Sequence, residues 1–172
     1  KLAHHYPSAA IDLLCRKGNE SLFDQHPKIH TILAWNKKQQ KYRHWWQLLL
    51  QIRRHQYDWV INLHRFTSSG IWTAFSGAKW TAGFDKNPLS TLFYFVQPHN
   101  IDKRTASPHE IDRNASLIPF HTNEHRFLPK LYPTPLDFTS TQRDNSYITI
   151  APFSVWYTKE IPWKKWQKLL RA

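Results

Sequence analysis

The 172-residue chain is poor in cysteine, glycine and acidic residues, and these shortages disfavour several classes of protein. The single cysteine, Cys15, excludes a disulfide framework and suits a reducing compartment. We expect it to be a small buried hydrophobe in a strand. Only four glycines occur, and none has the spacing of a dinucleotide-binding loop or a P-loop. An NAD enzyme and an ordinary NTPase are therefore disfavoured.

Other sequence signatures are missing as well. No apolar run approaches the roughly 20 residues that cross a bilayer, and no signal segment opens the chain, so a soluble protein is expected. The eleven histidines are scattered, so no metal site is predicted, and no cofactor is expected. A Gly-x-Ser-x-Gly elbow is absent, which disfavours a hydrolase. Methionine is absent even at position 1, and the first residues resemble the end of a helix, so we expect a piece to precede Lys1.

Positive charge and aromatic residues are abundant. Lys and Arg number 24 against 12 Asp and Glu, which gives a formal net charge of +12. Hydrophobic residues make up 41% and aromatic residues 15%, as in a globular protein with a real core. Such a surface attracts anions, whether nucleic acid, acidic lipid headgroups or phosphorylated and carboxylated sugars.

The hydrophobic pattern alternates strands with helices. Strands are expected at residues 11–16, 32–35, 58–64, 81–84 and 147–153, and helices at 38–56, from 67 onward, at 107–117 and at 163–171. Residues 92–96 suit a strand or a helix end, and residues 122–145, with three prolines, suggest a loop. This order predicts an α/β fold with a mostly parallel sheet.

Several of these segments carry more detailed expectations. The strand at 58–64 is nearly all apolar, which is typical of burial on both faces. In the helix at 38–56 the expected apolar face comprises Tyr42, Trp45, Trp46, Leu49 and Ile52, and its basic face is expected to be a solvated surface. The next helix is expected to have a Thr67-Ser-Ser69 cap and an inner face of Ile71, Ala74, Phe75 and Ala78. Ser107 and Pro108 read as the start of a capping box.

Two junctions between a strand and a helix place cations where anions bind. His64 and Arg65 follow the strand at 58–64, and ligands of parallel α/β sheets bind at the carboxyl ends of strands. The alternative is a packed His64 and a solvated Arg65. At the second junction, Lys159 lies between the strand at 147–153 and a helix opened by Pro162, where free N–H groups favour a phosphate. The alternative there is an ordinary loop with a solvated lysine.

Ordered motifs along nearly the whole chain resemble the heptosyltransferases, glycosyltransferase family 9. The matching segments are residues 6–12, 53–58, 59–63, 76–78 and 82–84, His109 with Arg113, and Thr158-Lys159-x-x-Pro162-x-x-x-Trp166. The last segment resembles the family's Ser/Thr-Lys-x-Trp-Pro motif, with Ile161 where the family usually has tryptophan. These enzymes add heptose from an ADP-sugar to the inner core of lipopolysaccharide.

The resemblance implies the N-terminal domain of a GT-B type glycosyltransferase with a Rossmann-like sheet. Residues 1–121 would form the acceptor-side domain, 122–146 a proline-rich linker, and 147–172 the start of the donor-binding domain. Ser154, Thr158 and Lys159 would bind the donor diphosphate, and His64, Arg65, Lys86 and Arg113 the anionic acceptor saccharide. The family's first strand and its catalytic aspartate would precede Lys1, so this piece is expected to be inactive alone.

The resemblance also implies partners and a location. The partners would be an ADP-sugar and the anionic lipopolysaccharide core, with no nucleic acid. The protein would be cytoplasmic, with peripheral contact at the inner membrane. A different class of function stays open at this point: a non-catalytic basic α/β domain that binds nucleic acid or an acidic surface. Its cations would form a continuous stripe with aromatic platforms instead of gathering at strand ends.

Overall fold

The computed structural model describes residues 2–99, 109–118, 128, 130–142, 146–147 and 157–171. The chain divides into two compact units, Lys1–Pro133 and Thr134–Ala172. The first unit holds all the strands that the structure describes, and the second holds two helices. Each unit is described by itself below.

The strands of the first unit form two parallel sheets. β1 (Asp12–Arg16) pairs with β2 (Thr31–Trp35). β3 (Trp59–Asn62), β4 (Trp80–Phe84) and β5 (Phe95–Gln97) form a second sheet in that order. Every pairing is parallel, as the alternation of strands and helices predicts. The run at 92–96 divides into a 3-10 helix (Ser90–Leu92) and β5.

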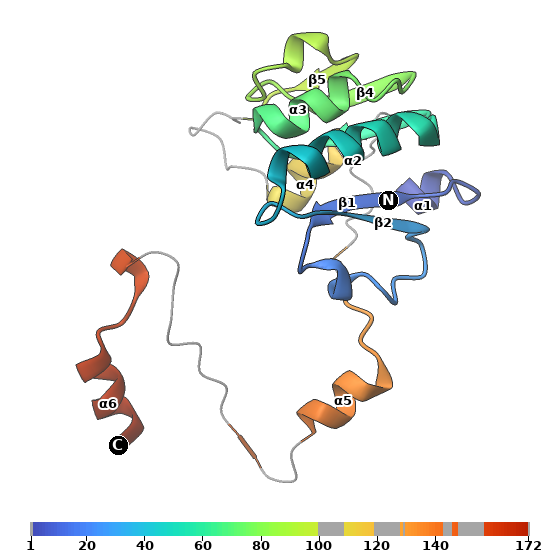
Figure 1. The fold of residues 1–172 in the computed structure, drawn as a ribbon. Helices are drawn as coiled ribbons and strands as arrows, with labels where there is room; N and C mark the ends of the chain where they lie inside the picture. Colours follow the sequence, from blue (N-terminus) through green and yellow to red (C-terminus); the bar gives the residue numbers. More distant parts are fainter. Residues whose placement is uncertain are drawn as a thin grey trace. The chain divides into compact units, whose positions relative to one another are not determined.

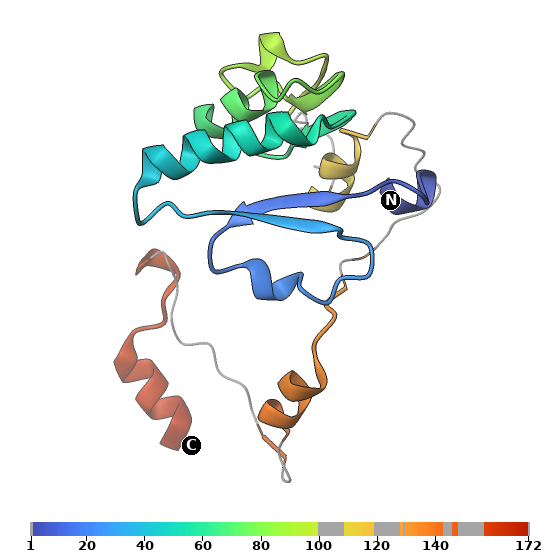
Figure 2. The same cartoon turned by 45° about the vertical axis from the view of Figure 1, so that its right-hand side comes forward.

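Helices connect and cover these strands. The first unit contains α1 (Leu2–His5), a 3-10 helix (Glu20–Leu22), α2 (Lys41–His55), α3 (Thr67–Ala74) and α4 (Glu110–Ala115). Both ribbon views show α2 between the β1–β2 sheet and α3 (Figure 1 and Figure 2). Left-handed residues, Gln40 and Gln56, flank α2 at its two ends. None of the helices in the described ranges is long and apolar enough to span a membrane.

A core of large side chains joins α2 to the strand layer and to α3. Its buried members come from β2, α2 and α3: Leu33, Leu48, Leu49, Ile52 and Trp72. The indole N–H of Trp72 donates to the carbonyl of Trp45 at 3.1 Å, and the indole N–H of Trp45 donates to the carbonyl of Ser68 at 3.3 Å. The two indoles stack with centroids 5.7 Å apart. These paired contacts satisfy buried polar groups while they fix α2 against α3.

The expected inner faces of α2 and α3 were partly wrong. Leu49 and Ile52 are buried on α2, but Tyr42 and Trp46 are 76% and 58% exposed. On α3 the buried residues are Gly70, Trp72 and Thr73, whereas Phe75 is exposed. The cause is that α3 packs against α2 as well as against its sheet, which turns Trp72 inward. The cap also differs, because Phe66 holds the N-cap position without a side-chain bond.

The strand expected at 58–64 is shorter and less buried than its composition suggests. It covers Trp59–Asn62, and only Asn62 is fully buried. Leu63 is half exposed. Among the described residues β3 pairs with β4 and forms one edge of its sheet, and its first three residues are only partly buried.

The second unit contains α5 (Pro135–Thr141) and α6 (Trp163–Arg171), with a 3-10 helix (Tyr157–Lys159) between them. The proline-containing segment expected to be a loop thus includes a helix. α5 begins with a capping box, in which the Thr134 hydroxyl accepts from the Asp137 N–H and the Asp137 carboxylate accepts from the Thr134 N–H. Pro135 follows the cap, a position where proline is well tolerated. The strand expected at 147–153 lies outside the described residues, apart from Tyr147.

Candidate functional site at the carboxyl ends of the strands

The sheet of β3, β4 and β5 gathers its outgoing loops along one edge, because all three strands are parallel. His64 and Arg65 follow β3, and Lys86 follows β4 two residues after its end. All three residues are exposed. Three of the four predicted acceptor residues therefore follow neighbouring strand ends, where ligands of parallel α/β sheets bind.

Asn87 ties the first two of these loops together. Its side chain is 1% exposed, and its amide donates to the carbonyls of His64 at 3.0 Å and Phe66 at 3.1 Å. The amide oxygen accepts from the N–H of Leu89 at 3.0 Å. Because the buried amide uses both donors and its acceptor, it fixes the loop after β3 relative to the loop that carries Lys86.

Two further residues shape the loop that carries His64 and Arg65. The side-chain oxygen of Asn62 accepts from the N–H of His64 at 2.9 Å, which turns the chain at the end of β3. Gly70, on α3, lies so close to Asn87 that a Cβ at position 70 would be 2.2 Å from the Asn87 amide oxygen. A glycine is therefore required for Asn87 to enter its position.

Arg113 approaches the same edge from α4. Its guanidinium carbon lies 5.9 Å from the centroid of the Phe84 ring, and Phe84 is the last residue of β4. The guanidinium pairs with Glu110 one turn earlier on the helix. The Nε of Arg113 is buried without a partner among the described residues. The structure thus brings Arg113 to the end of β4, but with part of its charge balanced by Glu110.

His99 and Asp85 extend the edge toward β5. The N–H of His99 donates to the Asp85 carboxylate at 2.8 Å, and the His99 ring lies against Phe84 with centroids 5.2 Å apart. Asp85 immediately follows β4, and its own N–H donates to the carbonyl of Gln97 at the end of β5. These contacts give the cationic edge a nearby carboxylate and a ring nitrogen, neither of which was predicted.

α4 begins at Glu110, later than the expected capping box implies. Its N-cap is His109, whose ring nitrogen Nδ1 accepts from the N–H of Ile111 at 3.2 Å. Ser107 and Pro108 lie outside the described residues. The bond from Ile111 makes the exposed His109 a helix cap.

The predicted donor residues belong to the second unit. Thr158 and Lys159 end the 3-10 helix Tyr157–Lys159, and both are exposed. α6 begins four residues after Lys159, at Trp163, and the carbonyl of Pro162 accepts from the N–H of Lys165 at 2.8 Å. Lys159 therefore lies just ahead of a helix N-terminus, as expected. Ser154 lies outside the described residues.

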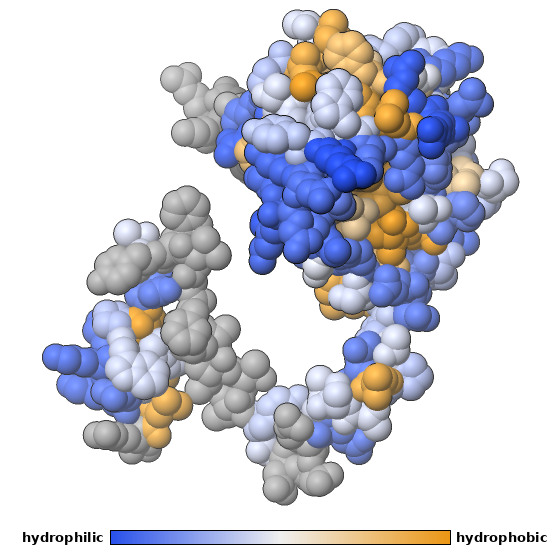
Figure 3. Space-filling model, in the orientation of Figure 1, coloured by the Kyte–Doolittle hydropathy of each residue, from blue (hydrophilic) through white to orange (hydrophobic). Residues whose placement is uncertain are grey.

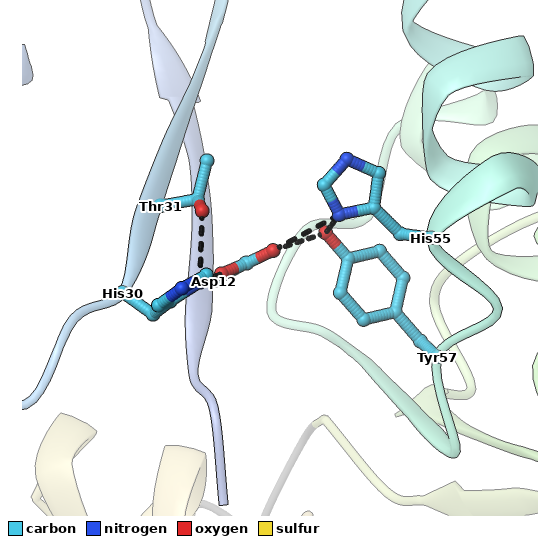
Figure 4. A network of polar contacts seen from close by, with 5 residues as sticks. All are labelled: Asp12, His30, Thr31, His55 and Tyr57. Atoms are coloured by element: carbon cyan, nitrogen blue, oxygen red, sulfur yellow. Dashed lines mark hydrogen bonds and ion pairs between the residues drawn. The ribbon is translucent and has the colours of Figure 1, made fainter.

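A separate polar network lies at the opposite, amino ends of the strands (Figure 4). The Tyr57 hydroxyl, just before β3, donates to Asp12, the first residue of β1, at 2.6 Å. His30 and His55 place their Nδ1 atoms 3.2 Å and 3.4 Å from the same carboxylate. The network links the two sheets across their amino ends, away from the candidate site.

Burial and hydrogen bonding act in opposite directions on the Asp12 carboxyl. Burial raises its pKa, but hydrogen bonds with Tyr57, His30 and Thr31, together with the charge of His30, outweigh burial and hold the pKa below its ordinary value. Burial and the contact with Asp12 raise the pKa of Tyr57. Asp12 is thus an ionised acceptor and Tyr57 a neutral donor over the whole physiological pH range.

One comparison identifies the family. The model of glycosyltransferase family 9 (heptosyltransferase) matches residues 45–172, well over half of the chain. The chain belongs to glycosyltransferase family 9. No curated protein and no solved structure matches the chain.

The family assignment agrees with the parallel α/β architecture, which is that of the N-terminal, Rossmann-like domain of a GT-B glycosyltransferase. The match includes α2 from Trp45 onward, all three strands of the candidate site and the whole second unit. This heptosyltransferase-family protein is accordingly a glycosyltransferase, which uses a sugar donor and an acceptor.

Asn62 and Asn87 fix the loops of the candidate site but do not face its ligand, and neither was predicted from the sequence. Asn62 interrupts an apolar strand just before His64, and an asparagine there is a visible signal for a turn. Asn87 lies in Asp-Lys-Asn-Pro directly after β4, which also reads as a turn. Neither signal reveals that the Asn87 side chain reaches back to the loop after β3.

Proposed function

We propose that this glycosyltransferase takes part in the transfer of heptose, or a related sugar, from an ADP-sugar to the inner core of lipopolysaccharide. The reaction takes place on the cytoplasmic side of the inner membrane, where the protein is peripheral. The observation that carries the proposal is the joining of His64, Arg65 and Lys86 at one sheet edge by the buried Asn87.

On the acceptor side, exposed cations suit a saccharide that carries carboxylates and phosphates. Arg65 offers a planar fork of donors and Lys86 a compact charge, and both stand on loops held by hydrogen bonds. Held loops favour binding because less conformational freedom is lost when the ligand arrives. Arg113 contributes a guanidinium next to Phe84, with Glu110 limiting its net charge.

On the donor side, Lys159 binds the diphosphate of the ADP-sugar and stabilises the charge that develops on the departing ADP. Thr158 and Ser154 assist as hydroxyl donors to the phosphate oxygens. The nearby N-terminus of α6 adds free N–H groups of the kind that bind phosphates. Residues 1–121 serve the acceptor, 122–146 connect, and 147–172 begin the donor-binding part.

The acceptor assignment is tested with a matched pair of lysines. Lys86 follows the carboxyl end of β4, whereas the exposed Lys79 precedes its amino end. We expect Lys86→Ala to weaken the binding of an inner-core oligosaccharide by roughly ten- to a hundredfold in calorimetric titration, the equivalent of one charge-assisted hydrogen bond. Lys79→Ala should leave the affinity unchanged. Equal losses of affinity in both variants would show that only the net charge of the protein matters. That result would contradict the assignment.

The donor assignment is tested with ADP. Lys159→Ala should lower the affinity for ADP, while Lys164→Ala, an exposed lysine within α6, should not. Because the acceptor titration uses no nucleotide, the two assignments stand or fall separately. Saturable ADP binding that is insensitive to Lys159→Ala would contradict the donor role.

A further inference from the structure

The outward face of α2 carries a row of exposed apolar side chains. Tyr42, Trp46 and Leu50 follow one another at four-residue steps and are 76%, 58% and 53% exposed. Side chains four residues apart lie on the same face of a helix, so the three form a continuous row along the helix. We refer to these three residues as the α2 row.

The interior of the protein does not require the α2 row. The buried side of α2 is supplied by Leu48, Leu49 and Ile52. The neighbouring Trp45 is turned inward, where its indole N–H donates to Ser68. Trp46, in contrast, meets the edge of the Trp45 ring and otherwise projects from the helix with more than half of its surface exposed. Three large apolar side chains on one exposed helix face are unusual for a surface that meets only water.

Positive charge surrounds the row. Residues 36–57 contain no Asp or Glu, and their cations include Lys37, Lys38, Lys41, Arg43 and Arg54, all exposed. Lys41 places its ammonium 5.2 Å from the centroid of the Tyr42 ring. Arg53 is occupied, because it donates to the carbonyl of Phe75 at 2.8 Å. Figure 3 views the molecule from the side on which α2 lies in front and shows strongly hydrophilic side chains there beside hydrophobic ones.

We propose that this face of α2 docks on an anionic lipid surface. The α2 row enters the boundary between headgroups and acyl chains, and Arg43, Arg54 and the lysines before the helix contact the lipid phosphates. Amphipathic helices that lie in a membrane interface have this composition, with Trp, Tyr and Leu on the apolar side and Lys or Arg beside them. The complete lack of acidic residues across residues 36–57 gives the charge complementarity with the anionic partner.

A nucleic acid fits the same face less well. Stacking on bases needs flat rings, and Leu50 supplies none although it continues the row by one turn. Lipid acyl chains accept all three side chains of the row, ring or not. The helix of 15 residues is about 22 Å long and presents the row parallel to its axis, as docking in the plane of a membrane requires.

This inference rests on the proposed function only in that a lipid-linked acceptor explains why the enzyme would meet a membrane. Vesicle binding is measured without donor or acceptor sugars, and the α2 row shares no residue with the candidate site. Failure of lipid binding would therefore contradict the peripheral location proposed above but leave the sugar-transfer chemistry untouched, and failure of the sugar-binding assignments would leave lipid docking untouched.

The test is co-sedimentation of the chain with vesicles of phosphatidylcholine alone or of phosphatidylcholine mixed with phosphatidylglycerol. We expect binding to the mixed vesicles only, and at least about a tenfold loss of affinity in a variant with Tyr42, Trp46 and Leu50 all changed to serine. The matched control changes three exposed apolar residues on other elements, Leu22, Phe75 and Leu92, to serine and should bind as the unchanged chain does. Circular dichroism and the urea midpoint establish that each variant is folded.

Two further measurements separate the contribution of the positive charges from that of the apolar α2 row. Arg43→Gln with Arg54→Gln should weaken the preference for anionic vesicles while leaving the fold intact, because Lys37 and Lys38 remain. Lipids brominated along their acyl chains should quench the fluorescence of the unchanged chain more than that of Trp46→Phe, because Trp46 enters the interface. Equal vesicle binding by the row variant and the control overturns the proposal. So does a row-dependent dimer in sedimentation, or row-dependent binding to a DNA duplex, in place of vesicle binding.

Discussion

The side-chain amide of Asn87 donates a hydrogen bond to the main-chain carbonyl of His64 at 3.0 Å, across the gap between the loops after β4 and β3. The two residues are 23 positions apart in the sequence. Through this bond and a second bond to the carbonyl of Phe66, the buried and uncharged Asn87 fixes the loops that carry the exposed Arg65 and Lys86. The geometry of the anion site therefore depends on a side chain that does not itself face the solvent.

Asn87→Asp should destabilise the protein and disturb the site. The replacement keeps the size and the acceptor for Leu89 but removes both donors, so two carbonyls face an oxygen. We expect the free energy of unfolding to fall by about 1–3 kcal/mol or more, as for a buried polar group without its partner. Urea titration measures the loss. Asn19→Asp, the same change at an exposed position, is the control and should have little effect.

Tyr57→Phe should weaken the link between the two sheets. The change removes the hydroxyl that donates to the Asp12 carboxylate at 2.6 Å and leaves the ring in place. We expect a loss of about 1.5–3 kcal/mol, which is typical of a hydrogen bond to a charged group. Urea titration at neutral pH measures it. A Tyr6→Phe variant, at an exposed tyrosine, should be close to neutral.

The same network predicts how stability depends on pH. The pKa of Asp12 is lowered by folding, so its contribution is present above the ordinary value of 3.8 and is lost as the pH falls through the lower folded value. The pKa of Tyr57 is raised by folding, so its contribution is complete below the ordinary value of 10.0 and is lost at higher pH. Tyr57→Phe should abolish the alkaline loss that Tyr57 causes and make the acid loss smaller, because the folded pKa of Asp12 then lies closer to its ordinary value. An unchanged alkaline limb in the variant would show that Tyr57 does not cause it.

Two tryptophans of neighbouring elements should respond very differently to truncation. Trp72→Ala removes a side chain that is 4% exposed and packs against Trp35 and Trp45, so a loss of about 3–5 kcal/mol is expected. Trp46→Ala removes a mostly exposed ring and should change stability by about 0.5 kcal/mol or less. Thermal or urea unfolding of both variants gives the comparison. Similar losses would mean that Trp46 belongs to the core after all.

Gln56→Gly should stabilise the protein. Gln56 closes α2 in the left-handed conformation, with φ 49° and ψ 51°, which glycine adopts without the cost of a Cβ. We expect a gain of about 0.5–1 kcal/mol in urea titration. Gln51→Gly, an exposed position inside the same helix, should lose a similar amount, so the two variants should differ in sign.

Much of the fold follows from local pattern. The run Trp-Val-Ile-Asn predicts β3 and the spacing of Leu49 and Ile52 predicts α2, because both signals depend only on neighbours in the chain. The order of these elements then predicts parallel pairing. The helix α5 was missed although its Thr-Pro-x-Asp start is visible, because the three prolines around it dominated the interpretation of that segment.

Side-chain environment was harder to predict than secondary structure. Tyr42 and Trp46 fall at helical spacing with the core residues of α2, and nothing in the sequence shows that α2 meets its sheet and α3 with only part of its hydrophobic surface. At the candidate site the basic residues His64, Arg65 and Lys86 could be named from their positions after strands. Asn87 could not, because its role depends on a contact between loops 21 to 23 residues apart.

Gly70 and Asn87 form a sterically coupled pair. A Cβ at position 70 would collide with the Asn87 amide oxygen at 2.2 Å, so Gly70→Ala alone should be harmful, and a smaller residue at 87 would relieve the collision only by releasing both loops. Among descendants of this sequence the two positions are thus expected to change together or not at all. A substitution at this uncharged helix position would then alter acceptor preference without changing any of the basic residues.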